Sequence, residues 1–85
     1  MSVTKTLKQR GKRYGKFDEH AEISQGLQDV MREAEKWESL TPAQKECLQM
    51  VQHKVARILN GDPNYKDNWH DIQGYAKLVE DLCDA

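Results

Sequence analysis

Residues 54–78 read KVARILNGDPNYKDNWHDIQGYAKL, and this stretch decides the fold because it contains a helix end followed by a helix start. Gly61 accepts left-handed backbone and Pro63 cannot continue a helical hydrogen-bond ladder, so the pattern predicts a helix end near Leu59. The same stretch holds four cations and three aspartates. We therefore expect a functional site around this turn.

A helix over about 67–83 is predicted after the turn. Asp67 or Asn68 can cap it. Its apolar positions recur at steps of three and four: Trp69, Ile72, Ala76, Val79 and Leu82 or Cys83. Gly74 inside the helix costs up to about 1 kcal/mol relative to alanine, and we expect it to mark a close approach between helices.

The preceding helix is predicted over about 42–59. Thr41 is a good cap, Pro42 suits the first helical position, and Gln44 stands three residues after the cap. The apolar stripe consists of Leu48, Val51, Val55 and Ile58.

A first helix is predicted over about 18–37, with Asp18 as its cap. Its apolar positions are Ile23, Leu27, Val30, Met31, Ala34 and Trp37. No strand pattern competes, so the sequence predicts an all-α fold of three amphipathic helices. We expect residues 17–85 to form one helical domain after a basic N-terminal arm, 1–16.

The arm is basic although the whole chain is nearly balanced. Of thirteen cations, six precede Asp18, which is the first of fourteen acids. Such an arm could contact nucleic acid or fold back on its own domain. Tyr14 is its only aromatic residue and no nucleic-acid-reading motif is present, so nucleic acid is the less favoured partner.

A chain of 85 residues can build only a small core. We therefore expect a homo-oligomer, a dimer or a tetramer, that completes a larger helical bundle. No apolar run approaches the roughly 20 residues of a membrane span, and no signal-peptide pattern opens the chain, so a cytoplasmic protein is expected. Cys47 and Cys83 show no metal-ligand spacing and are expected as reduced thiols.

Two sequence blocks resemble a family of short phage and prophage proteins of unknown function. They are R-Y-G-x-F at residues 13–17 and K-x-x-R-I-L-x-G-D-P-x-Y-x-D-x-W-x-D-I-x-G-Y-x-x-L at residues 54–78. This family is in turn distantly similar to the MazG-like all-α nucleoside triphosphate pyrophosphohydrolases. The resemblance implies the cytoplasm of a bacterial host and a nucleotide ligand.

In the MazG-like enzymes an E-x-x-E pair and an E-x-x-D pair hold magnesium, which bridges the nucleotide phosphates. The resemblance places the first pair at Glu19 and Glu22. The second pair is fitted only in part, because Asn68 stands where an acid is expected before Asp71, although the adjacent Asp67 could substitute. The implied metal ligands are thus the four acids, with Glu22 and Asp71 as catalytic residues.

Four further residues are candidates for binding the substrate. Lys54 and Arg57 stand three residues apart and could grip a phosphate, or could form salt bridges with the aspartates of the following helix. Tyr75 could stack on a base or simply be half-buried packing. Arg13, in the first block, could contribute from the arm.

The carboxylates also have structural interpretations. Glu19 and Glu22 lie in a first helical turn, where acids oppose the helix dipole, and Asp67 could be only a cap. Two functions therefore stay open. One is a magnesium-dependent nucleoside triphosphate pyrophosphohydrolase of low or lost activity, favoured if the acids converge. The other is a non-enzymatic helical binding protein for a nucleotide or a host or phage macromolecule, favoured if cations neutralise the aspartates.

Overall fold

The structure is a computed structural model that describes residues 2–84. Within this range it contains helices and no strands, which confirms the all-α prediction. The elements are α1 (Val3–Tyr14), α2 (Phe17–Glu33), the 3₁₀ turn η1 (Trp37–Ser39), α3 (Pro42–Asn60) and α4 (Lys66–Glu80). The expected number of three helices was wrong, because the described residues form four.

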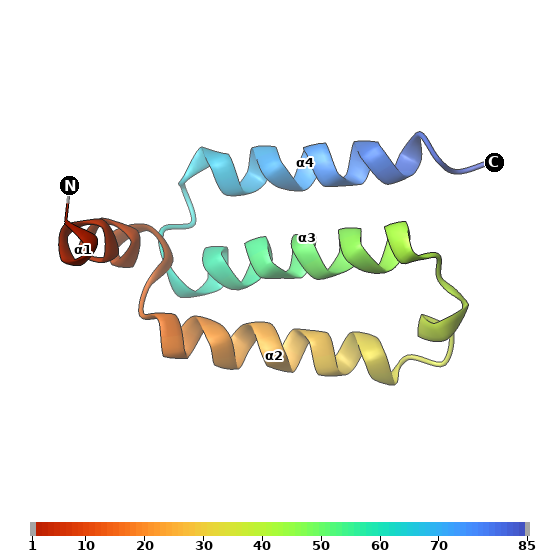
Figure 1. The fold of residues 1–85 in the computed structure, drawn as a ribbon, viewed down its shortest axis with the longest axis horizontal. Coiled ribbons are helices and arrows are strands. Elements are labelled where there is room, and N and C mark those ends of the chain that lie inside the picture. Colours follow the sequence, from red (N-terminus) through yellow and green to blue (C-terminus); the bar gives the residue numbers. More distant parts are fainter. Residues whose placement is uncertain (1, 85) are drawn as a thin grey trace.

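Helices α2, α3 and α4 lie side by side in one layer, with α3 in the middle (Figure 1). Helix α1 lies at the end of the layer where α2 begins and α3 ends. The molecule measures 45 × 26 × 22 Å and its radius of gyration is 14.7 Å, compared with roughly 12 Å for a compact domain of this length. The layer is therefore open, and no second layer covers it within the described residues.

Most of the expected N-terminal arm is helix α1. The Ser2 hydroxyl caps it by accepting a hydrogen bond from the backbone amide of Lys5 at 3.1 Å, and Gly15 ends it with φ = 78°. None of its residues is buried, and Val3 and Leu7 are 74% and 62% exposed. Because α1 buries no apolar side, its sequence lacks the repeating apolar stripe by which the other helices were predicted.

The predicted start of α3 is confirmed. The Thr41 hydroxyl accepts a hydrogen bond from the amide of Gln44 at 3.1 Å, and the Gln44 side chain accepts one from the amide of Thr41 at 2.9 Å. This reciprocal pair satisfies two amides that have no partner inside the helix. The helix ends at Asn60, one residue later than predicted.

The bounds of α2 and α4 differ from those predicted, and both helices end earlier: α2 at Glu33 and α4 at Glu80. Helix α2 stops at Glu33, and Trp37 lies in η1, where it is buried against the end of the layer. Helix α4 begins at Lys66 after Tyr65, so Asp67 is not its cap. Instead the Asp67 carboxylate accepts a hydrogen bond from the Tyr65 hydroxyl at 3.0 Å.

The interior of this chain is unusually polar. Among the described residues, Trp37 and Ala56 are the only buried apolar side chains. The buried polar residues are His20, Ser24, Gln52, Lys54 and Asn68. The apolar stripes predicted as core are thus mostly half-buried or exposed.

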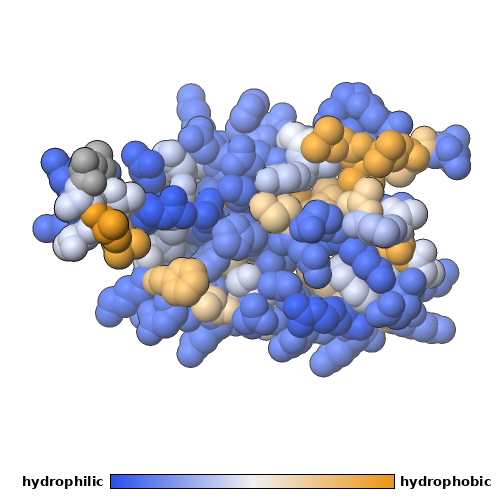
Figure 2. All heavy atoms as spheres, in the orientation of Figure 1, coloured by the Kyte–Doolittle hydropathy of each residue, from blue (hydrophilic) through white to orange (hydrophobic). Residues whose placement is uncertain are grey.

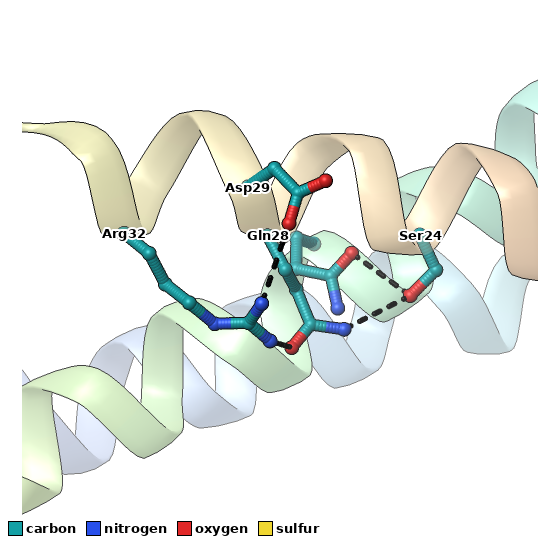
Figure 3. Close-up of polar contacts among 5 residues, drawn as sticks. Ser24, Gln28, Asp29 and Arg32 are labelled. Atoms are coloured by element: carbon teal, nitrogen blue, oxygen red, sulfur yellow. Dashed lines mark hydrogen bonds and ion pairs between the residues drawn. The ribbon is translucent and has the colours of Figure 1, made fainter.

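Part of the contact between α2 and α3 is a polar network (Figure 3). The Ser24 hydroxyl donates a hydrogen bond to the Gln52 side chain at 3.2 Å, and Gln28 donates to Ser24 at 3.4 Å. Arg32 then donates to the Gln28 side-chain oxygen at 2.8 Å. Paired in this way, the buried groups avoid the cost of an unmet hydrogen bond.

The turn before α2 and the turn after α3 lock together. The Asn60 side-chain amide donates to the carbonyls of Tyr14 and Lys16, both at 3.0 Å. The backbone amide of Asp62 donates to the carbonyl of Arg13 at 2.7 Å. The two sequence blocks used to find the family resemblance therefore meet in space and hold α1 against the layer.

Gly74 does not mark a close approach between helices, so that expectation was wrong. A Cβ atom placed there would meet no atom within 4 Å. We predict that Gly74→Ala raises the free energy of unfolding by about 0.5–1 kcal/mol, because alanine loses less backbone entropy in a helix. Urea unfolding followed by circular dichroism measures this, and a destabilised variant would show that a neighbour packs on Gly74.

No helix in residues 2–84 is both long enough and apolar enough to cross a membrane.

Candidate functional site

A pocket of about 450 Å³ lies where α1, the start of α2 and the end of α3 meet. Three cations reach its wall: Arg10 from α1, Lys16 from the turn before α2, and Arg57 from α3. Among the described residues, no acidic side chain lines it, and neither arginine forms an ion pair with one. The wall therefore carries positive charge that the chain itself leaves unopposed.

Two aromatic rings accompany these cations. The guanidinium of Arg57 lies 4.1 Å from the centroid of the Tyr14 ring, and that of Arg10 lies 5.1 Å from it. Such cation–π contacts hold both guanidiniums beside one ring. Phe17, which also lines the pocket, is 81% exposed at its rim. The pocket thus offers aromatic faces beside fixed positive charge.

Two neutral histidines complete the wall. His20 Nε2 and His53 Nδ1 lie 3.3 Å apart, so one nitrogen donates a proton and the other accepts it. Burial, and then the charge of Arg57, lower the pKa of His20 below its usual 6.5. Burial, and then the charges of Arg57 and its neighbours, lower the pKa of His53 to about 4. His20 Nδ1 is buried with no hydrogen-bond partner among the described residues.

These lowered pKa values predict loss of stability in acid. The unfolded chain binds a proton at His53 near pH 6.5, whereas the folded chain binds it only near pH 4. The contribution of the neutral His53 to the free energy of unfolding is therefore fully present above pH 6.5 and is lost as the pH falls towards 4. We expect the melting temperature to fall over this range and His53→Gln to weaken the dependence. His70→Gln, at an exposed position on α4, is the control.

The four acids predicted to bind metal are not brought together within one chain. Helices α2 and α4 lie on opposite sides of α3, so Glu19 and Glu22 are separated from Asp67 and Asp71 (Figure 1). Both glutamates are exposed. In the part of the chain that the structure describes, no three histidine, cysteine, aspartate or glutamate side chains are grouped to hold a metal ion.

Asp71 already has a cationic partner. The ammonium of Lys54 lies 3.0 Å from its carboxylate, and the two side chains are 10% and 42% exposed. The nearby Asn68 is 1% exposed, and its side-chain nitrogen has no partner in residues 2–84. A divalent ion approaching Asp71 would have to displace an ammonium that is itself expensive to leave unpaired. Magnesium therefore does not fit this site as one chain arranges it.

The substrate-binding candidates are spread over the molecule. Lys54 faces α4, whereas Arg57 stacks on Tyr14 of α1, so the two cations do not act together. The guanidinium of Arg13 lies 5.0 Å from the Tyr65 ring. Tyr75 is half-buried on α4, and its carbonyl accepts a hydrogen bond from the Cys47 thiol. Of these candidates, only Arg57 reaches the pocket.

Sequence reasoning missed most residues of the pocket. Arg10 and Tyr14 stand four residues apart, which places them on one face once residues 3–14 are known to be helical. That spacing was the available signal. His20 and His53 are 33 residues apart, and no local pattern could bring them together.

Fold and pocket together define a small all-α protein with a basic pocket lined by aromatic rings. The model of a family described as a domain of unknown function (DUF6378) matches residues 3–83, and the chain belongs to this family. No curated protein and no solved structure matches the chain. The family description names no ligand, so the geometry of the pocket has to indicate one.

Proposed function

We propose that this protein is a non-enzymatic helical binding protein for a nucleotide, which it holds in the pocket between α1, α2 and α3. The observation that supports this most is the group of three unopposed cations, Arg10, Lys16 and Arg57, around a pocket of about 450 Å³. This volume is within the range of small-molecule sites, about 300–1,000 Å³. A ligand that is both planar and negatively charged suits such a wall.

Each part of a nucleotide has a partner in this arrangement. The phosphates accept hydrogen bonds from the guanidiniums of Arg10 and Arg57, both of which lie against the Tyr14 ring. The Lys16 ammonium adds a third charge at the mouth of the pocket. The base packs on the exposed ring of Phe17, and this contact favours aromatic ligands without selecting one base.

We propose further that the chain is a phage or prophage relative of the MazG-like proteins, active in the host cytoplasm, in which pyrophosphohydrolysis has been lost. The motif block at residues 54–78 supports the relationship. The salt bridge between Lys54 and Asp71 and the buried amide of Asn68 support the loss, because they occupy the positions where the acid pair was expected.

Binding is tested by titrating the protein with deoxynucleoside and ribonucleoside triphosphates in a calorimeter, without divalent metal. We expect Arg57→Gln to weaken binding roughly 10- to 100-fold, because a charge-assisted hydrogen bond contributes about 1.5–3 kcal/mol. Lys77→Gln is the matched control, because Lys77 lies on α4, outside the pocket, and pairs with Asp81. Equal affinities of the two variants would contradict the assignment of the pocket.

Catalysis is tested on the same protein by phosphorus NMR after magnesium is added. An unchanged triphosphate spectrum, together with calorimetric binding, supports a binding protein. New monophosphate and pyrophosphate signals that disappear in Asp71→Asn would overturn the non-enzymatic assignment and establish a pyrophosphohydrolase. If neither binding nor hydrolysis occurs with any nucleotide, the proposed function is wrong.

A further inference from the structure

The layer of α2, α3 and α4 has one apolar face that no described element covers. On α3, Lys54 points towards α4 and Gln52 towards α2, as their contacts with Asp71 and Ser24 show. Successive residues of an α-helix are rotated by about 100°, which places Leu48, Val51 and Val55 between these two directions, on one side of the layer.

The flanking helices extend this apolar face. On α2, Ile23 and Val30 lie roughly a quarter turn from His20 and Ser24, which contact α3, and on α4 Trp69 lies a third of a turn or more from Tyr75 and Asp71. Because α2 and α4 both run antiparallel to α3, the rotation brings these side chains to the same side as Val51. One side of the layer is therefore apolar across all three helices.

The exposures of these residues agree with an uncovered face. Val30 is 69% exposed, Leu48 42% and Trp69 50%. The opposite side, which Arg57 and His53 of the pocket share, is mostly hydrophilic over α2 and α3 (Figure 2). Over α2 and α3 the chain thus separates a polar face, which contains the pocket, from an apolar face, whereas the C-terminal part of α4 is apolar on the pocket side too (Figure 2).

The accessible surface of this chain is larger than that of a compact monomer of the same mass. The chain exposes 6,499 Å² of accessible surface, whereas a compact monomer of 9.9 kDa exposes about 5,200 Å². The excess is roughly 1,300 Å² for each chain. Obligate homodimers bury about 1,000 Å² or more for each partner, so the excess, part of which lies on the unburied helix α1, is large enough for a stable dimer.

We propose that a second copy of this chain packs on the apolar face, apolar side to apolar side, about a twofold axis. The central stripe Leu48, Val51, Val55 and Ile58 is spaced by three, four and three residues, which is the repeat that lets a helix pack against its own copy. The resulting dimer has two layers of three helices and the hydrophobic core that one chain lacks. Both pockets stay open on its outer faces.

The wild-type protein alone decides the proposal. We expect sedimentation equilibrium to give twice the mass of one chain at micromolar concentration. The melting temperature should rise with protein concentration, because association stabilises only the folded state. A mass of one chain with melting independent of concentration would overturn the proposal, as would binding of a different macromolecule to a folded monomer.

A pair of variants locates the interface. Leu48→Glu should weaken association roughly 100-fold or more, because each dimer would bury two unpaired carboxylates. Leu78→Glu is the matched control, because Leu78 is 65% exposed and lies on the side of α4 opposite Trp69. A dimer that tolerates Leu48→Glu, or that Leu78→Glu disrupts equally, would show that another face is the interface.

Discussion

Replacing Gly61 with alanine is expected to lower the free energy of unfolding by roughly 3 kcal/mol. A Cβ atom at Gly61 would overlap the carbonyl oxygen of Arg13 and lie 2.5 Å from the Cα atom of Tyr14. These are backbone atoms, which cannot swing aside as a flexible side chain can. The lock between the two turns would have to open.

Gly15 gives the reciprocal test from the other side of the lock. Its φ is +78°, a conformation that disfavours any residue with a Cβ atom, and a Cβ there would overlap the carbonyl oxygen of Asn60. Gly15→Ala should therefore lose a similar amount of stability. Gly74→Ala, at an open helical position, is the matched control and should be slightly stabilising.

Urea unfolding of the three variants separates the contributions. If Gly61→Ala and Gly15→Ala unfold at the same urea concentration as the wild type, the close approach of the two turns does not exist in solution. Opening of the lock should also move Tyr14 away from Arg57, so we expect both variants to lose nucleotide affinity even where they remain folded.

The second large effect is expected at the salt bridge between α3 and α4. Asp71→Ala should lower the free energy of unfolding by about 2 kcal/mol, because it leaves the ammonium of Lys54 nearly buried and unpaired. We place the cost below the 3–5 kcal/mol of fully buried pairs because the Asp71 side chain is 42% exposed. The double variant Lys54→Met, Asp71→Ala should recover much of the loss, because it removes the unpaired charge.

Magnesium distinguishes this structural role from metal binding. A metal that binds only the folded protein raises its melting temperature. We expect millimolar magnesium to leave the melting of the wild type and of Asp71→Ala equally unchanged. Stabilisation of the wild type that Asp71→Ala abolishes would show that Asp71 is a metal ligand, and would favour the pyrophosphohydrolase over the binding protein.

The sequence by itself determined the helical class and the clearest helix boundaries. The capping box of Thr41 and Gln44 acts through atoms a few residues apart, so its pattern can be recognised locally. The helix also stops beside Gly61 as predicted, but not through left-handed backbone: φ of Gly61 is −134°, and the close approach of Arg13 and Tyr14 is what requires a glycine. The spacing of Leu48, Val51 and Val55 likewise showed that α3 has one apolar side. It could not show that nothing within residues 2–84 covers that side.

Only the tertiary structure decided which side chains of those helices come together to form the pocket. Arg57 stacks on Tyr14, 43 positions earlier, and Asn60 binds the carbonyl of Tyr14 across 46. Such contacts depend on how two turns meet, and no local spacing encodes that. Helix α3 lies between α2 and α4 (Figure 1), and it therefore separates Glu22 from Asp71, although both residues fit the expected motif. Helix formation is decided by neighbours along the chain, whereas a site is decided by neighbours in space.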